Sequence, residues 1–248
     1  MRSVVATALV VAAAVPVAAQ RLEPFIPIGV VVHGAGGVTG DRRDFLTLAK
    51  RRFNVIGVRD RATGELRLSR LVTWLEPGAD DKPAAIPANG VVAVSASTSG
   101  KELRLHAWQA IAKGARGIVF EPLVALMHNE DALDAASEFA DNVTRNAALF
   151  APLRPRESTA DVRVDAPAAT IDARFLESNA AFVLIVANQT SDVHRVTLKF
   201  SSEFPEAIWQ NMETGAAVNF VASAEGPTYT RTFTPFDVVV LMIRKQYK

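Results

Sequence analysis

Hydrophobic positions recur at helical spacing over residues 102–113, and a short, continuous hydrophobic run follows them. Gly114 separates the two segments, and a glycine tolerates the left-handed conformation that commonly ends a helix. Residues 118–120 are too few for a helix and are typical of a buried parallel strand. This strand ends at Glu121, and Pro122 then turns the chain away. The helix is predicted to bury Leu103, Leu105, Ala107, Trp108, Ile111 and Ala112.

Three earlier hydrophobic runs also have the character of buried strands, and each of them ends in polar residues. Residues 25–32 precede His33, residues 53–58 precede Arg59 and Asp60, and residues 90–94 precede Ser95. Helices are predicted over residues 41–52, 68–75 and 129–150. Strands that alternate with helices predict an α/β fold whose parallel strands end at one edge of the sheet. We therefore expect the polar residues at the strand ends, Glu121 included, to gather there.

The hydrophobic pattern changes to a period of two after about residue 160, and turn residues separate the runs. Regular short strands of this kind predict an antiparallel β-sandwich. The fold class is thus α/β, with an incomplete (β/α) barrel-like domain over residues 20–156 and a β-sandwich domain over residues 157–248. The predicted sandwich strands are residues 162–164, 171–176, 182–186, 196–200, 207–209, 218–221 and 230–243.

Residues 1–19 have the composition of a secretory signal peptide. Arg2 gives a positive start, residues 4–17 are apolar, and Val17, Ala18 and Ala19 are small residues before Gln20. The apolar stretch is shorter than the roughly 20 residues that span a bilayer. We expect cleavage after Ala19 and a secreted or periplasmic bacterial protein with no membrane partner after cleavage.

Charge and composition exclude several classes of partner and site. The formal net charge is +1 and no basic stripe is visible, so nucleic acid is not an expected partner. The chain has no cysteine, so neither disulfides nor cysteine–metal sites can form. No cluster of histidine and carboxylate residues has the spacing of metal ligands, and no cofactor is expected.

The glycine-rich turn after the first strand allows a different interpretation. Gly34, Gly37 and Gly40 lie between a strand and a helix, as in a dinucleotide-binding turn, and Arg59 would then contact a 2′-phosphate. The usual G-x-G-x-x-G spacing is absent because position 39 is Thr39. A dinucleotide-binding oxidoreductase is therefore the less favoured alternative, beside a glycine turn without a ligand.

Several segments resemble secreted TIM-barrel glycoside hydrolases, β-galactosidase-like enzymes included. Residues 26–30 and 44–56 are similar to the first strand, helix and second strand of those enzymes. Residues 103–120 resemble the segment between their seventh and eighth strands, and residues 236–243 resemble the last strand of a sandwich that follows the barrel. The resemblance implies a fold of barrel and sandwich, and carbohydrate as the partner.

The chain also departs from that family. The resemblance implies a nucleophilic carboxylate after the seventh strand, where this chain has Ser95. The middle strands, and the acid/base position that follows the fourth, have no counterpart between Arg59 and Gly90. A full (β/α)8 barrel needs about 250 residues. The barrel is therefore truncated or closed differently, or a homo-oligomer of two copies completes it.

Two carboxylates are the candidate catalytic residues, because glycoside hydrolysis uses a pair of carboxyl groups about 5–9.5 Å apart. Glu121 is the candidate acid/base residue, and the alternative is a strand-end carboxylate paired with an arginine. Asp60 is its candidate partner, and the alternative is a residue that caps a turn. His33, Arg59 and Ser95 are candidate substrate-binding residues.

The sequence thus favours a secreted, glycoside-hydrolase-like protein that acts on carbohydrate, by carboxylate acid/base hydrolysis if it is active. The alternative is a catalytically inactive relative that binds glycan or protein.

Overall fold

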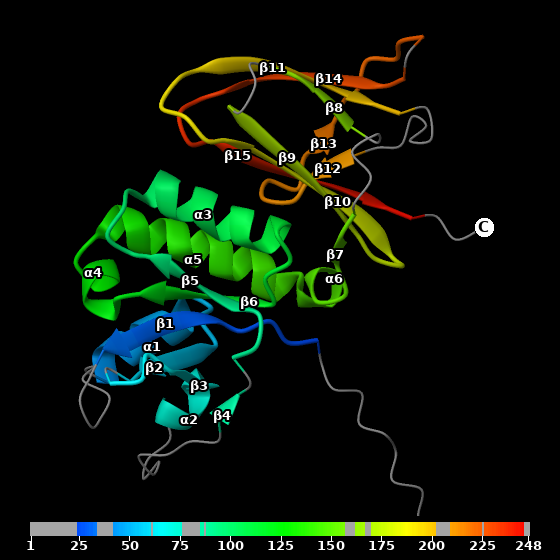
Figure 1. Ribbon diagram of the computed structural model, residues 1–248. Coiled ribbons are helices and arrows are strands. Elements are labelled where there is room, and N and C mark those ends of the chain that lie inside the picture. Colours follow the sequence, from blue (N-terminus) through cyan, green and yellow to red (C-terminus); the bar gives the residue numbers. More distant parts are fainter. Residues whose placement is uncertain are drawn as a thin grey trace, which may run out of the picture.

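The computed structural model describes residues 24–33, 42–60, 62–75, 85–86, 88–156, 162–166, 170–201, 209–224 and 226–245. Three sheets and one layer of helices make up this mixed α/β structure (Figure 1). The predicted signal peptide and the glycine-rich turn lie outside the described residues. Within the described residues, no helix has both the length and the apolar character needed to cross a membrane.

A six-stranded sheet forms the first part of the fold. Its four parallel strands lie in the order β2-β1-β6-β5, and β3 and β4 continue the sheet antiparallel beyond β2. In the described residues the outer strands β4 and β5 each pair on one side only, so the sheet is open. The strands are β1 (Ile28–His33), β2 (Val55–Arg59), β3 (Leu66–Arg70), β4 (Ala85–Ile86), β5 (Val91–Ser95) and β6 (Gly117–Glu121).

The prediction of a helix over residues 68–75 is wrong in its first part. Leu66–Arg70 is strand β3, and only Leu71–Leu75 forms a helix, α2. Leu68 pairs with Gly57 of β2 and is buried on the sheet, where glycine leaves space for the leucine side chain. Pairing with a distant strand therefore overrides the local pattern, which is a common limit of periodicity.

The helices cover one face of this sheet. Units β1-α1-β2 and β5-α3-β6 step across the sheet in the same direction, so right-handed crossovers place their helices on the same face. One hydrophobic cluster accordingly joins strand residues such as Val30 and Phe120 to residues of these helices. The helices are α1 (Arg42–Lys50), α3 (Gly100–Ala112), α4 (Leu123–Met127), α5 (Glu130–Arg145) and α6 (Ala147–Phe150).

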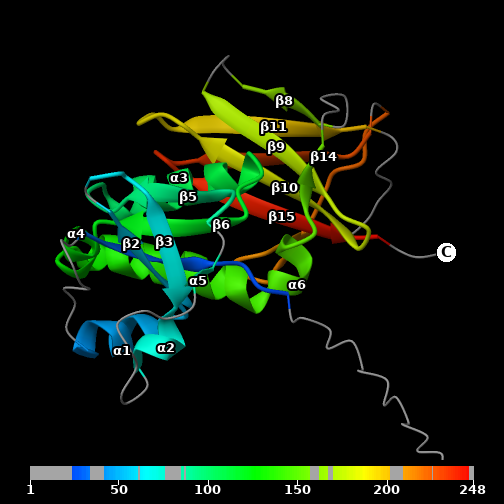
Figure 2. The ribbon, with the colours of Figure 1, turned by 60° about the horizontal axis from the view of Figure 1, so that its bottom comes forward.

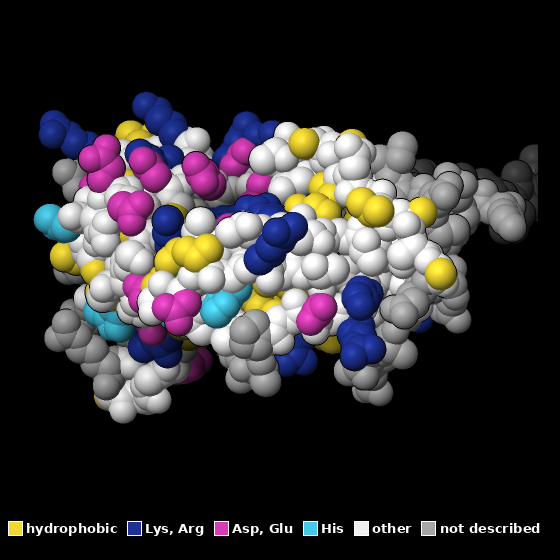
Figure 3. Space-filling model, turned by 90° about the horizontal axis from the view of Figure 1, so that it is seen from above, with side chains coloured by type: hydrophobic (Ala, Val, Ile, Leu, Met, Phe, Trp, Pro, Cys, Tyr) yellow, Lys and Arg dark blue, Asp and Glu magenta, His cyan; other side chains and the backbone are white. Residues whose placement is uncertain are grey.

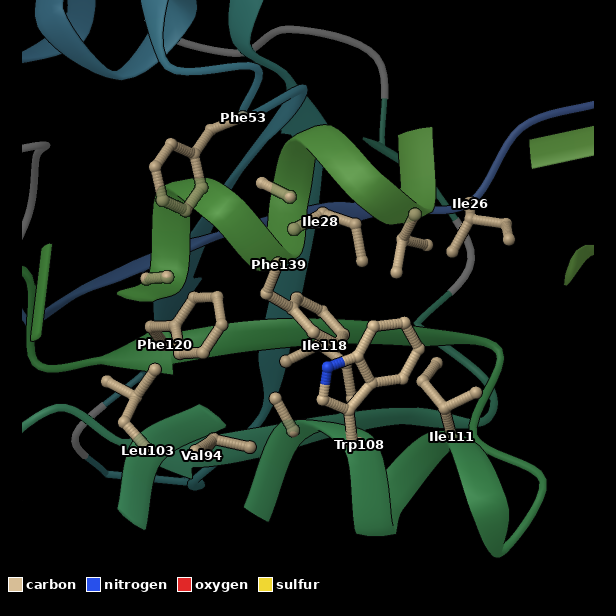
Figure 4. Packing of buried hydrophobic residues seen from close by; sticks show 14 of the residues in the cluster. Ile26, Ile28, Phe53, Val94, Leu103, Trp108, Ile111, Ile118, Phe120 and Phe139 are labelled. Atoms are coloured by element: carbon tan, nitrogen blue, oxygen red, sulfur yellow. The ribbon is translucent and has the colours of Figure 1, made fainter. Parts of the chain in front are cut away.

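Helix α3 forms as the sequence predicts. Ser99 and Glu102 make a capping box at its start, and Gly114, with a φ of 93°, follows its end. Trp108 is fully buried, which confirms its predicted place in the core. Its ring centroid lies 4.9 Å from that of Phe139 on α5 (Figure 4). The centroid of the Phe150 ring lies 5.7 Å away.

The opposite face of the sheet carries no described helix. Its buried residues are Val31, Val55, Leu68 and Val119, and partly buried side chains such as Phe25 and Val91 pack against them. In a barrel of this strand order, the helix-free face would be the interior.

Two antiparallel sheets form the second part of the fold, and a second hydrophobic cluster that includes Phe200 and Trp209 lies between them. The strands of the first are β7 (Arg154–Pro155), β9 (Ile171–Glu177), β10 (Ala181–Asn188), β12 (Trp209–Asn211), β13 (Ala217–Val218) and β15 (Val238–Arg244). Those of the second are β8 (Val162–Asp165), β11 (His194–Phe200) and β14 (Thr228–Phe233).

The single strand predicted over residues 230–243 is in fact two strands, β14 and β15, which lie in different sheets. A turn separates them, and within it Phe236 has a φ of 57°. Pro235 has no backbone N–H to donate to a ladder, so the alternation cannot continue as one paired strand.

Helix α3 lies between the first sheet and the sheet of β9, β10 and β15, and it contacts all three of these strands (Figures 1 and 2). Val183, Ile185 and Val240 of that sheet belong to the same hydrophobic cluster as Trp108. Arg104 of α3 forms an ion pair with Glu213 and donates a hydrogen bond of 2.9 Å to the carbonyl of Val238. Packing and polar contacts thus join α3 to the second half of the chain, and the domain division at residues 156/157 stays a prediction.

The surface seen from the side of β8, β11 and β14 carries charges of both signs. Lysine and arginine side chains lie among aspartates and glutamates, and hydrophobic side chains form small separate groups (Figure 3). On the described part of that face, this mixture differs from the continuous basic stripe of a nucleic-acid interface.

Candidate functional site

Four of the five predicted site residues end four adjacent parallel strands. His33 ends β1, Arg59 ends β2, Ser95 ends β5 and Glu121 ends β6. The strand register places His33 beside Arg59, and Ser95 beside Glu121. These residues therefore meet at the carboxyl-terminal edge of the sheet, where sequence analysis places them.

The alternation of side chains along a strand also sets the face on which these residues lie. Residues two apart point to the same side, so Glu121 shares a face with Val119, and His33 with Val31. Both valines belong to the helix-free face. The same alternation places Arg59 with Val55 and Ser95 with Val91. All four side chains thus project from one face of one edge.

Glu121 is held by Arg59 across the end of β1. The Nε and Nη2 atoms of Arg59 donate hydrogen bonds of 3.1 Å and 2.9 Å to Oε2 of Glu121. Nε2 of His33 lies 3.8 Å from the same oxygen. The side chains of Glu121 and Arg59 are 25% and 28% exposed, so a ligand in solution can reach both. Glu121 therefore has the contacts of the alternative named above, a strand-end carboxylate that is paired with an arginine.

A turn positions the guanidinium of Arg59. Its Nη1 atom donates a 3.1 Å hydrogen bond to the carbonyl of Gly64. Gly64 has a φ of 72°, a conformation that glycine adopts without a steric penalty. Gly64 is not among the site residues that the sequence predicts. Its proximity to a strand-end arginine is the signal that could have found it.

The carboxylate of Asp60 binds backbone groups of the turn that follows it. Its Oδ1 atom accepts hydrogen bonds from the backbone N–H groups of Ala62 at 2.8 Å and Thr63 at 2.9 Å. These two hydrogen bonds favour the charged form of the Asp60 carboxyl and so hold its pKa below the ordinary value. The bond from Thr63 has the larger effect, and the bond from Ala62 follows. Asp60 therefore has the contacts of the turn-capping alternative. Its role as a partner of Glu121 stays a prediction.

Ser95 begins the loop that leads to helix α3. Its hydroxyl accepts a 3.3 Å hydrogen bond from the N–H of Ser97, and its carbonyl accepts one of 3.3 Å from the hydroxyl of Thr98. A serine nucleophile needs a base that takes its proton. Among the described contacts, none joins the Ser95 hydroxyl to a histidine or a carboxylate, so Ser95 suits ligand binding better than attack.

Together these side chains offer a guanidinium, an imidazole, a hydroxyl and one carboxylate. Oε2 of Glu121 accepts two hydrogen bonds from Arg59, which hold the carboxylate and the guanidinium together. Such a set can hydrogen-bond a polar, uncharged ligand through both donors and acceptors. Over the described ranges, no group of three or more histidine, aspartate or glutamate residues could hold a metal ion.

The sheet topology bears on the dinucleotide alternative. A doubly wound fold binds its ligand where the strand order reverses, with helices on both faces. The parallel strands β5, β6, β1 and β2 follow one another in a single direction, and the described helices cover one face. This part of the chain thus offers no switch point, while Gly34, Gly37 and Gly40 lie outside the described residues.

Comparisons of the sequence identify no relative. No protein-family model matches the chain. No curated protein matches it either.

Solved structures that resemble the fold are glycoside hydrolases. A maltogenic α-amylase from Thermotoga neapolitana is 13% identical, with a TM-score of 0.42 over 63% of this chain and 41% of the amylase. A putative α-N-acetylgalactosaminidase from Bacillus halodurans is 10% identical, with a TM-score of 0.42 over 60% of this chain and 33% of that protein. A β-L-arabinopyranosidase from Geobacillus stearothermophilus is 9% identical, with a TM-score of 0.39 over 60% and 31%.

This chain therefore spans less than half the length of each of these neighbours. With TM-scores below 0.5 and identities of 13% or less, the superpositions are too loose to transfer an activity or a site residue. The argument for function rests on the residues of the strand-end site.

Proposed function

We propose that this chain is an exported, glycoside-hydrolase-like protein that acts on carbohydrate by binding it at the site of His33, Arg59, Ser95 and Glu121. The resemblance of residues 103–120 to the segment between the seventh and eighth strands of a glycoside-hydrolase barrel supports this proposal. So does the one-directional order of the parallel strands, which is the order of a barrel segment.

The chemistry of the site supports a carbohydrate ligand. A sugar presents neighbouring hydroxyl groups that both donate and accept hydrogen bonds. Arg59 and His33 offer donors, Glu121 offers acceptors, and the Ser95 hydroxyl can do either. The ion pair between Arg59 and Glu121 fixes the direction of these groups before the ligand arrives, which lowers the entropic cost of binding.

One observation favours binding over hydrolysis: Glu121 is engaged by Arg59, and the candidate second carboxyl, that of Asp60, is engaged by its own turn. Both retaining and inverting hydrolysis require two carboxyl groups on either side of the scissile bond. The proposed protein therefore holds glycan and, acting alone, does not cleave it.

The test is to measure glycan binding and turnover on the same preparations. The chain beginning at Gln20 is screened on a glycan array and by calorimetry, and is assayed on a panel of aryl glycosides. We expect binding without turnover above the protein-free background. Glu121→Gln should weaken binding by about 10–100-fold, because hydrogen bonds to charged groups contribute about 1.5–3 kcal/mol. Glu138→Gln, at an exposed position on α5, is the matched control and should bind like the wild type.

Other outcomes would contradict this proposal. Turnover that Glu121→Gln lowers by about 10²–10⁴-fold would make Glu121 a general acid or base, and the protein an active hydrolase. Turnover that survives the substitution would remove Glu121 from the mechanism. A stable, folded chain that binds no glycan on the array would remove carbohydrate as the ligand.

Export is a separate part of the proposal and has its own measurement. The apolar stretch that ends in Val17, Ala18 and Ala19 is the motivating feature. Intact mass spectrometry of the protein recovered from its native host should give a chain that begins at Gln20, found outside the cytoplasm. Mature cytoplasmic protein that retains Met1 would rule out the signal peptide.

A further inference from the structure

Strand β5 lies at an open edge of the first sheet. It pairs with β6 on one side, and no described strand pairs with its other side. Natural sheets usually protect such edges with charged residues, prolines or bulges. The five residues of β5, VVAVS, include no charge and no proline, and Val92 is 39% exposed. The composition of this edge therefore does not oppose the addition of a further strand.

The backbone of Ala93 presents hydrogen-bonding groups along this edge. Successive residues of a strand direct their N–H and C=O groups to alternate sides. The carbonyl of Gly90 accepts a 2.7 Å hydrogen bond from the N–H of Arg116, and the N–H of Ala96 donates one of 2.8 Å to the carbonyl of Glu121. Even-numbered residues of β5 thus bond toward β6, so both backbone groups of the exposed Ala93 point away from it. Ala93 can exchange two hydrogen bonds with one residue of an added strand.

A groove of about 350 Å³ runs beside this edge, between β5 and helix α3. The strand contributes residues 92–95 to its wall, and the helix contributes mainly His106, Gln109, Ala110 and Lys113. Val94 belongs to the cluster on the helix side of the sheet, and Val92 shares its face by alternation. A strand added to β5 would therefore direct every second side chain into the groove.

The polar groups of the groove suit a carboxylate ligand. His106 and Lys113 are exposed, and the described lining includes no aspartate or glutamate. None of the described ion pairs involves Lys113. Helix α3 returns along β5 in the crossover to β6, so Lys113 lies toward Val92 and His106 toward Val94. An acidic side chain beside Val92 would thus find an ammonium group within the groove.

We propose that the edge of β5 binds an extended, acidic peptide segment of a partner protein, which pairs antiparallel with β5 as an added strand. The peptide residue opposite Ala93 exchanges two hydrogen bonds with it. The residue opposite Val94 places an apolar side chain in the groove, and the residue opposite Val92 places a carboxylate near Lys113. In this mode of recognition the main-chain bonds give affinity and the alternate side chains give specificity.

The surroundings of the edge fit a single extended strand. The sheet of β9, β10 and β15 contacts α3, which separates it from the first sheet. A second copy of this chain, paired through its own β5, would bring its own sheet of this kind into the same space. One extended segment needs only the spacing of a strand, about 4.8 Å. A glycan lacks the regular N–H and C=O groups that pair with a strand edge, so this ligand differs from that of the strand-end site.

The test begins with a phage-displayed library of random eight-residue peptides, selected on the chain that begins at Gln20. The selected peptides should share an apolar residue followed two positions later by aspartate or glutamate, because these residues lie opposite Val94 and Val92. A synthetic copy of one selected peptide is then measured by calorimetry. The wild-type chain should bind it in a 1:1 complex.

A charge reversal tests the acidic contact. Lys113→Glu replaces an attraction with a repulsion and should weaken binding of the peptide by about 3–10-fold. A peptide with lysine in place of its acidic residue should bind Lys113→Glu better than the wild type. Lys101→Glu, on the same helix but outside the groove, is the matched control and should bind like the wild type. Circular dichroism checks that each variant is folded.

Methylation of the peptide backbone tests the strand pairing on the wild-type chain. An N-methyl group on the residue between the apolar and the acidic one removes the N–H that the Ala93 carbonyl accepts, and should weaken binding at least about fivefold. An N-methyl group on the acidic residue, whose N–H points away from β5, is the control and should leave binding nearly unchanged. Ala93→Pro removes the matching donor of the protein without removing a bond to β6, so it should act like the first methylation.

Three results would overturn the proposal. The library could yield no peptide above background on a folded chain. Selected peptides could tolerate both methylations equally, which would exclude a ladder with β5. Finally, Lys113→Glu could weaken binding of a glycan while no peptide is selected, which would assign the groove to carbohydrate.

Discussion

Trp108→Ala should lower the free energy of unfolding by about 3–5 kcal/mol, the range seen for truncation of a buried aromatic side chain. The indole is fully buried in the cluster that joins the first sheet, α3, α5 and the inner face of the second half. It packs edge-on against Phe139 of α5 (Figure 4). Its Nε1 atom has no hydrogen-bond partner among the described residues, so the substitution breaks no described polar contact and acts through lost packing.

The measurement is urea unfolding followed by circular dichroism, with and without a bound glycan. Val124→Ala is the control, because Val124 is 64% exposed on α4 and its truncation should change stability by less than about 0.5 kcal/mol. A Trp108→Ala protein that keeps wild-type stability but loses glycan binding would make Trp108 a sugar platform.

Gly29→Ala should destabilise the protein by about 3 kcal/mol or more, at or beyond the upper end of the usual cost of overpacking. A β-carbon at Gly29 would lie 2.0 Å from the carbonyl oxygen of Val55 on β2. That oxygen belongs to the backbone of the neighbouring strand, so only a separation of β1 from β2 can relieve the clash. The strands that carry His33 and Arg59 would then move apart.

Gly57→Ala is the matched control for this substitution. It also adds one methyl group within the same sheet, but that methyl would meet the side-chain ends of Leu66, Leu68 and Val31 at 3.0–3.1 Å. Side chains can shift by a few tenths of an ångström, so Gly57→Ala should cost distinctly less than Gly29→Ala in the same unfolding assay. Equal costs would show that the backbone contact at Gly29 is not what limits substitution.

The elements that the sequence predicts well are those that local spacing determines. The hydrophobic spacing up to Ala112 and the stop at Gly114 lie within one short segment, and the structure confirms both. Leu66–Arg70 fails as a predicted helix because its structure depends on β2, which is close in space but not part of the local pattern. The run over residues 230–243 fails because alternation continues through a turn whose two strands separate into different sheets.

The candidate site, too, has one part that the sequence predicts and one part that it does not. The rule that parallel strands end at a common edge suffices to bring His33, Arg59, Ser95 and Glu121 together. It does not tell whether a carboxylate at that edge is available for chemistry, because this depends on side-chain partners. Arg59 reaches Glu121 across the end of an intervening strand, and no spacing along the chain encodes that contact. The functional roles of these residues stay predictions.

The shared core also sets an order of events during synthesis. Val238 and Val240 of β15 belong to the cluster that surrounds Trp108, although they follow it by some 130 positions. A chain made from its N-terminus therefore cannot complete the core of its own helix layer until these last strands have been added. Before that point the helices expose the apolar surface that β10 and β15 later cover. Delayed folding of this kind would suit a polypeptide that crosses a membrane before it folds.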